Sequence, residues 1–127
     1  MKQKILIVDD SEFMRIIIKN ILTDWGYTSI LEADSGEQAI EIFKSKKPDL
    51  VLLDIIMPGI DGVETLKRIM GVNKKAKVAM VTAIGQEIVM YECKKSGSVD
   101  YLTKPFNKTQ IKELVKKIID LPKKEEQ

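Results

Sequence analysis

Short strand-like runs of apolar residues alternate with segments whose apolar residues recur every three or four positions. The short runs are typical of strands, and the longer pattern is typical of amphipathic helices. The runs predict strands at 5–8, 28–33, 50–53, 78–81 and 99–103. The segments between and after them predict helices around 14–25, 39–43, 63–70, 87–96 and 111–119. We expect the first, third and fourth helices to end at Gly26, Gly71 and Gly97.

Regular alternation of strands and helices with short connections is typical of a parallel sheet with right-handed crossovers. The run at 50–53 is wholly apolar, as expected of a strand that is covered on both faces. We therefore predict one α/β domain over residues 1–121, with a five-stranded parallel sheet and helices on both faces. Leu121 and Pro122 are expected to end the last helix, and residues 122–127 to form a frayed polar tail.

Polar residues stand where four of the predicted strands end. Asp9 and Asp10 follow the first strand, Asp54 follows the third, Thr82 follows the fourth, and Lys104 comes just after the fifth. The downstream ends of parallel strands line one edge of a sheet, where ligands bind. We therefore expect a site with three carboxylates, one hydroxyl and one ammonium.

The expected site suits a divalent cation and phosphoryl transfer. Three carboxylates carry −3, which Lys104 reduces to −2, and crowded like charges oppose folding unless a cation compensates them. Few, hard oxygen ligands favour Mg²⁺ over Ca²⁺. In phosphoryl transfer a carboxylate can be the nucleophile, while a cation, an ammonium and a hydroxyl stabilise the phosphoryl oxygens. Asp54 is the best nucleophile candidate because it stands alone after the central apolar strand.

The composition excludes several classes of protein. The chain has no histidine, which removes Ser-His-Asp and Cys-His chemistry and the usual zinc sites. Its net charge of +2 predicts no strong affinity for nucleic acid or anionic membranes. Its apolar runs are far shorter than the ~20 residues of a membrane span, and the first is too short for a signal peptide. The single cysteine, Cys93, excludes an internal disulfide and fits a cytoplasmic location.

Four motifs at the strand ends occur in a characteristic order and spacing: Asp9-Asp10-Ser11, DIIMPGIDG at 54–62, Thr82-Ala83 and Lys104-Pro105-Phe106. Together they resemble the signature of response-regulator receiver domains, over essentially the whole chain. The segment at 82–86, with no output domain expected, is most similar to the stand-alone chemotaxis regulators of the CheY type. The resemblance implies a flavodoxin-like, doubly wound (βα)5 fold.

The resemblance implies a role for each acidic residue of the site. Asp54 would accept a phosphoryl group from the phosphohistidine of a kinase. Asp10 and Asp54 would bind Mg²⁺ directly together with the backbone carbonyl of Ile56, and Asp9 would help through water.

It also implies how the phosphoryl group is held and sensed. Thr82, Ala83 and Lys104 would bind its oxygens. Tyr101 would be the switch aromatic, turning inward when the Thr82 hydroxyl moves to the phosphoryl group. The peptide bond between Lys104 and Pro105 would be cis.

The implied partners are a CheA-like histidine kinase, a motor or adaptor protein as target, and a possible phosphatase. The protein would be a monomer that binds neither nucleic acid nor membranes. The readout surface would comprise the fourth helix, the fifth strand and the fifth helix, with four plausible members: Met90, Lys94, Tyr101 and Lys108.

Two apolar residues stand at positions that are often polar in the family. Ile56 and Ile84 lie two residues after Asp54 and Thr82, respectively. Neither side chain offers a hydrogen bond to an attacking water, so we predict slow self-dephosphorylation.

Three other functions use similar chemistry. Phosphatases of the haloacid dehalogenase type carry a second Asp two residues after the first, where this chain has Ile56, which argues against an enzyme acting on external substrates. A flavodoxin-like carrier of FMN needs a hydroxyl- and glycine-rich phosphate loop, whereas Asp9 and Asp10 would repel the phosphate. A phosphorelay or phosphate-sink receiver shares the whole constellation and stays open. Taken singly, Asp10 or Ser11 could simply cap a helix.

Overall fold

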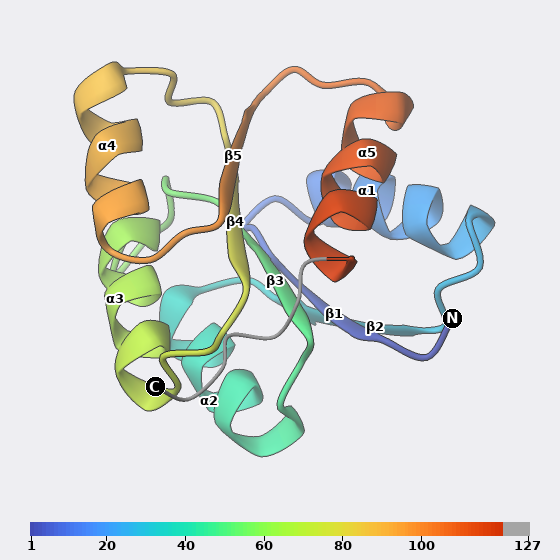
Figure 1. Cartoon of the computed structure of the whole chain (residues 1–127), viewed down its shortest axis with the longest axis horizontal. Helices are drawn as coiled ribbons and strands as arrows, with labels where there is room; N and C mark the ends of the chain where they lie inside the picture. The colour runs from blue at the N-terminus through green and yellow to red at the C-terminus, as the bar shows by residue number, and fades with distance from the viewer. Residues whose placement is uncertain (121–127) are drawn as a thin grey trace.

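Residues 1–120, which the computed structural model describes, contain five parallel strands in the spatial order β2-β1-β3-β4-β5 (Figure 1). The strands are β1 (Lys4–Val8), β2 (Ser29–Ala33), β3 (Leu50–Leu53), β4 (Val78–Thr82) and β5 (Asp100–Thr103). This order is that of the flavodoxin-like doubly wound sheets, in which the order of the strands reverses at a switch point between β1 and β3. The predicted fold is therefore confirmed.

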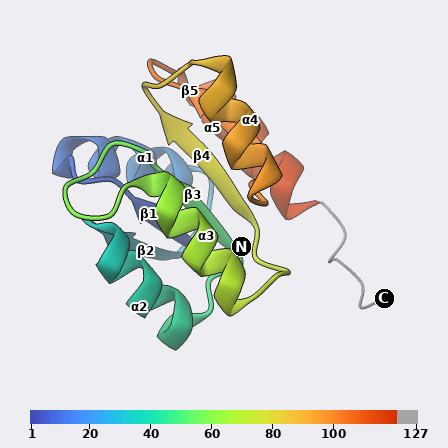
Figure 2. The same ribbon diagram turned by 90° about the vertical axis from the view of Figure 1, so that its left-hand side faces the viewer.

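Helices cover both faces of the sheet, as Figures 1 and 2 show from two sides. One face carries α1 (Glu12–Asp24) and α5 (Lys108–Ile119), and the other carries α2 (Gly36–Lys46), α3 (Gly62–Val72) and α4 (Glu87–Lys95). No helix in this described part of the chain is long and apolar enough to cross a membrane.

Alternate residues of the strands supply two separate apolar cores. Ile5 and Ile7 pack with α1 and α5, whereas Leu6 and Val8 pack with the helices of the other face. All four residues of β3 are at most 1% exposed, which explains why that run is apolar throughout. Full burial of one such side chain contributes about 1.5–3 kcal/mol to folding, so the central strands form a rigid base for the residues that follow them.

Helix α1 begins without using the side chain of Asp10, the acidic residue before its N-cap. Ser11 is the N-cap, and its hydroxyl oxygen accepts a hydrogen bond from the N–H of Met14 at 3.2 Å. Such a cap stabilises a helix by about 1 kcal/mol. Since Ser11 performs this function, the carboxylate of Asp10 is not used to begin the helix.

Several element boundaries differ from the predicted ones. Helix α3 continues through Gly71 to Val72, because Gly71 does not adopt the positive φ with which Gly26 and Gly97 follow their helices. Thr82 is the last residue of β4 rather than the residue after it. Strands β2 and β5 each begin one residue later than expected. The predicted end of the last helix and the tail at 122–127 lie outside the described residues.

Candidate functional site

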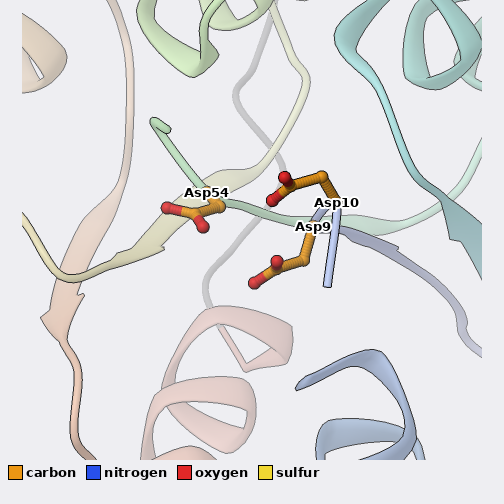
Figure 3. Close-up of side chains that lie close together, drawn as sticks. All are labelled: Asp9, Asp10 and Asp54. Carbon is orange, nitrogen blue, oxygen red and sulfur yellow. The ribbon is translucent and has the colours of Figure 1, made fainter. Parts of the chain in front are cut away.

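Three carboxylates meet where β1 and β3 end. Val8 pairs with Leu53 in neighbouring parallel strands, so the residues that follow them emerge side by side. One oxygen from each of Asp9, Asp10 and Asp54 lies within 4.8 Å of the others, and Figure 3 shows the three side chains gathered at this edge. Asp9 and Asp54 are buried, whereas Asp10 is exposed.

Lys104 follows β5, the outermost strand, and links that side of the sheet to the carboxylate cluster. Its Nζ donates hydrogen bonds to Asp9 Oδ2 at 2.7 Å and to Asp54 Oδ2 at 3.0 Å. Its backbone N–H donates to the carbonyl of Thr82 at 2.8 Å, and its peptide bond to Pro105 is cis. Burial alone would lower the pKa of Lys104, but the hydrogen bonds and charges of Asp9 and Asp54 outweigh it and raise that pKa. The ammonium is therefore held charged.

The donor set fits a divalent cation. The three carboxylates and Lys104 sum to −2, and every group on offer to a metal is a hard oxygen. Within residues 1–120 no hydrogen bond reaches the carboxylate of Asp10, and none reaches the carbonyl oxygen of Ile56. The side chain of Ile56 is 57% exposed, in the loop beside Asp54. These oxygens are the ones that a cation could use without breaking an existing bond.

Thr82 and Tyr101 are joined through the backbone of one residue. The N–H of Ile84 donates to Thr82 Oγ1 at 3.4 Å, and the Tyr101 hydroxyl donates to the Ile84 carbonyl. Thr82 is fully buried, Tyr101 is half-buried, and Ala83 between Thr82 and Ile84 is exposed. Burial, followed by the charges of Cys93 and Asp54, raises the pKa of Tyr101 to about 12. The hydroxyl therefore remains a hydrogen-bond donor at neutral pH.

Gly62, at the start of α3, packs directly against the backbone that carries Asp54. Its N–H donates to the Ile55 carbonyl at 2.8 Å. A Cβ at this position would lie 2.1 Å from the Asp54 carbonyl oxygen and 2.6 Å from the Ile55 Cα. Only glycine allows so close an approach, so Gly62 sets the path of the loop that follows Asp54.

The carboxylates of Asp9, Asp10 and Asp54 and the ammonium of Lys104 thus lie together where the strands end, with Thr82 as the last residue of β4 and Tyr101 inside β5. Sequence reasoning missed two contributors. One is the contact of Gly62 with the Asp54 backbone. The other is Arg15 on α1, whose Nη1 donates to the Asp9 carbonyl at 2.7 Å. The signal for Arg15 was its place in the first turns of α1, since helical side chains point back toward the helix N-terminus and so toward Asp9.

A large cavity of about 920 Å³ lies away from this cluster, at the opposite edge of the sheet. Its walls come from residues just before β1, β3 and β4, including Gln3, Asp49 and Lys77. The carboxylate cluster therefore does not line this cavity.

Known proteins are similar to this chain in both sequence and fold. The family described as the response regulator receiver domain matches residues 5–116. The chain is 39% identical over 118 residues to the chemotaxis protein CheY of Thermotoga maritima, which covers 93% of this chain and 98% of that protein. It is also 39% identical over 121 residues to sporulation initiation phosphotransferase F of Bacillus subtilis, which covers 95% of this chain and 97% of that protein.

A solved structure agrees closely with this fold. It is the crystal structure of the CheX-CheY-BeF3-Mg²⁺ complex from Borrelia burgdorferi. The superposition has a TM-score of 0.90 at 33% identity, covering 94% of this chain and 90% of that chain.

Proposed function

Because the chain belongs to the family of response regulator receiver domains, we propose that Asp54 accepts a phosphoryl group from the phosphohistidine of a kinase. The observation that carries this proposal is the position of the buried Asp54 carboxylate, within 4.8 Å of two other carboxylates and bonded to Lys104. In the transfer, an Asp54 oxygen forms a bond to phosphorus as the bond from phosphorus to the imidazole nitrogen breaks. The electron pair leaves with the imidazole, which takes up a proton.

The two oxygens of Asp54 are not equivalent. Oδ2 accepts the hydrogen bond from Lys104 at 3.0 Å, whereas within residues 1–120 Oδ1 accepts only a long one from the N–H of Ile56 at 3.4 Å. Oδ1 is therefore the freer nucleophile. Lys104 is placed to neutralise phosphoryl oxygens next to Asp54, and the Thr82 hydroxyl can donate to one of them.

Mg²⁺ is the cation that this site would hold. Asp10, Asp54 and the Ile56 carbonyl are the proposed direct ligands, and Asp9, already bonded to Lys104, would act through water. When bound, the ion supplies positive charge against the phosphoryl oxygens.

Phosphorylation then acts as a switch. An acyl phosphate adds roughly one negative charge and several acceptor oxygens to Asp54. Movement of the Thr82 hydroxyl toward those oxygens would break its bond to Ile84, which also holds Tyr101. The proposed readout surface is α4, β5 and α5, where Lys94 and Lys108 are exposed and Met90 is half-buried.

The relatives support chemotaxis as the process. We propose a CheA-like kinase as the phosphodonor and a motor or adaptor protein as the target, both met in the cytoplasm by a monomer. A relative has been crystallised with CheX, which supports a second partner at the phosphorylated site, and we propose a phosphatase in that role.

A phosphorelay is the second candidate function, because the chain is 39% identical to a protein named as a phosphotransferase. The two functions differ in where the phosphoryl group goes. Transfer of the phosphoryl group from Asp54 to the histidine of a second protein would favour the relay. Phosphorylation-dependent binding to a motor or adaptor protein, without that transfer, would favour the switch.

The test is the intact mass of the protein after incubation with acetyl phosphate and Mg²⁺. Asp54→Asn is the test variant, and Asp49→Asn is the matched control, because Asp49 lies immediately before the same strand, at its other end. We expect one phosphoryl adduct on the wild type and on Asp49→Asn, and none on Asp54→Asn or without Mg²⁺. An unmodified, folded wild type would overturn the proposal.

A further inference from the structure

Every polar group of Asp9 is fixed by a neighbour. Its N–H donates to the Ala33 carbonyl at 3.1 Å, and its Oδ1 accepts from the Ser11 N–H at 2.9 Å. Its Oδ2 accepts from Lys104, and its carbonyl oxygen accepts from Arg15 Nη1 at 2.7 Å. Asp9 is therefore a rigid point in the loop between β1 and α1.

The carboxylate of Asp10 has no comparable anchor. It is exposed, and no hydrogen bond of the described residues reaches it. Its position depends on the peptide unit that joins it to Asp9, because that unit is planar and includes both the Asp9 carbonyl and the Asp10 N–H. Whatever holds the Asp9 carbonyl oxygen thus also sets the direction in which the Asp10 side chain leaves the backbone.

We propose that Arg15 is a positioning residue for the metal site, which fixes the Asp9–Asp10 peptide unit and so places the Asp10 carboxylate beside Asp54. The inference rests on the proposed function, in which Asp10 is a metal ligand. Within residues 1–120 the Arg15 side chain makes no hydrogen bond to Asp10 or Asp54, so it acts through the Asp9 carbonyl.

The guanidinium of Arg15 is suited to fixing the Asp9–Asp10 peptide unit because it forms hydrogen bonds at two points. Arg15 Nε donates to Glu32 Oε1 on β2 at 3.2 Å while Nη1 reaches the Asp9 carbonyl. The Arg15 side chain is only 13% exposed. The planar fork of arginine can make both bonds in one geometry, whereas the single ammonium of a lysine cannot reproduce that fixed fork. Lys19 also pairs with Glu32, at 3.4 Å, but in the described part of the chain it makes no hydrogen bond to Asp9.

These contacts define a test whose main variant conserves charge. Arg15→Lys keeps the positive charge and removes the fork, Glu32→Gln keeps Arg15 and removes its ionic anchor, and Lys19→Gln is the matched control. The first readout is ¹⁵N relaxation of the Asp10 N–H without Mg²⁺. The second is the Mg²⁺ dissociation constant from calorimetric titration of the folded protein.

We expect Arg15→Lys to lower the order parameter of the Asp10 N–H from the ~0.85 of rigid backbone. We expect it to weaken Mg²⁺ binding roughly tenfold, as replacement of a residue that orients a metal ligand does. Glu32→Gln should act in the same direction and less strongly, and Lys19→Gln should match the wild type. If Arg15→Lys leaves both readouts unchanged, or if Lys19→Gln alters them equally, the positioning role is wrong.

The two proposals fail in different ways. A wild type that binds no Mg²⁺ would contradict the proposed metal site. The order parameter of the Asp10 N–H would still decide whether Arg15 fixes the peptide unit, because that measurement needs no metal.

Discussion

Replacement of Lys104 by methionine is expected to destabilise the fold by about 3–5 kcal/mol when divalent cations are absent. Lys104 Nζ lies 2.7 Å from Asp9 Oδ2 and 3.0 Å from Asp54 Oδ2, and the exposed fractions of these side chains are 17%, 3% and 8%. Removal of one partner from a buried ion pair costs ~3–5 kcal/mol, because the other charge remains buried and unpaired.

The repulsion within the cluster gives a figure of the same size. The carboxylate oxygens lie within 4.8 Å of one another, and two unit charges at that distance repel by about 3.5 kcal/mol at an effective dielectric constant of ~20. In the Lys104→Met variant no ammonium offsets this repulsion. Since a domain of this kind is stable by ~5–15 kcal/mol, the variant should still fold, though with a small margin.

Urea unfolding in EDTA and in millimolar Mg²⁺ measures the effect. Mg²⁺ should recover part of the loss, because a cation bound to the carboxylates reduces their repulsion and binds only the folded state. The difference between wild type and variant should also depend on pH. Asp9 and Asp54 raise the pKa of Lys104 above its ordinary 10.5. The stabilisation by Lys104 is therefore full below pH 10.5 and is lost as the pH rises through the higher pKa of the folded state.

Lys117→Met is the matched control. Lys117 Nζ pairs with Asp100 Oδ2 at 3.2 Å, but the lysine side chain is 68% exposed, and such surface pairs contribute ~0–1 kcal/mol. A loss at Lys104 no larger than the loss at Lys117 would refute the claim that the site stores uncompensated negative charge. A larger deficit in Mg²⁺ than in EDTA would do the same.

Three further changes test other parts of the site. Gly62→Ala should lower the free energy of unfolding in urea by about 1–3 kcal/mol and slow phosphoryl acceptance, because its Cβ would meet the Asp54 backbone. Gly71→Ala is the control: a Cβ there meets nothing within 4 Å, so this change should raise the free energy of unfolding by ~0.5–1 kcal/mol. The double variant Ile56→Asn with Ile84→Glu should lose its phosphoryl group several-fold faster than the wild type, and an unchanged decay would contradict the shielding of the acyl phosphate by these side chains. Tyr101→Phe should remove the tyrosinate absorbance change near pH 12. In the wild type, stability should fall from pH 10 to 12, because the unfolded chain ionises there first.

The strands of the sheet were predictable because each coincides with a run of mainly apolar residues. The run at 50–53 has no polar residue and lies in the centre of the sheet, between β1 and β4. The ends of helices were less predictable. Gly71 was expected to end α3, yet the helix continues to Val72 because Asn73 closes it through a bond to the Ile69 carbonyl.

The charged residues of the site were predictable because they follow strands that the apolar runs already reveal. Asp9, Asp54 and Lys104 stand directly after strands, so the topology alone brings them to one edge. The supporting contacts were not predictable from residue types. Arg15 acts on a backbone carbonyl, and Gly62 acts by having no side chain. Neither residue type forms a motif, and the one signal is the place of Arg15 in the first turns of α1, from which its side chain points back toward Asp9.

The link between Thr82 and Tyr101 illustrates this limit and also bears on the switch. Both hydroxyls are bonded to the backbone of Ile84, whose N–H and carbonyl would be present whatever its side chain. The bond to Thr82 is 3.4 Å long, beyond the 2.7–3.2 Å typical of such bonds, so the Thr82 hydroxyl is weakly held. A phosphoryl group on Asp54 would draw that hydroxyl toward itself by accepting a charge-assisted hydrogen bond from its O–H, and such bonds are roughly twice as strong as neutral ones. The residue that would lose the Thr82 bond is the one that holds Tyr101, and this shared backbone would give the proposed phosphorylation site a direct physical path to the proposed readout surface.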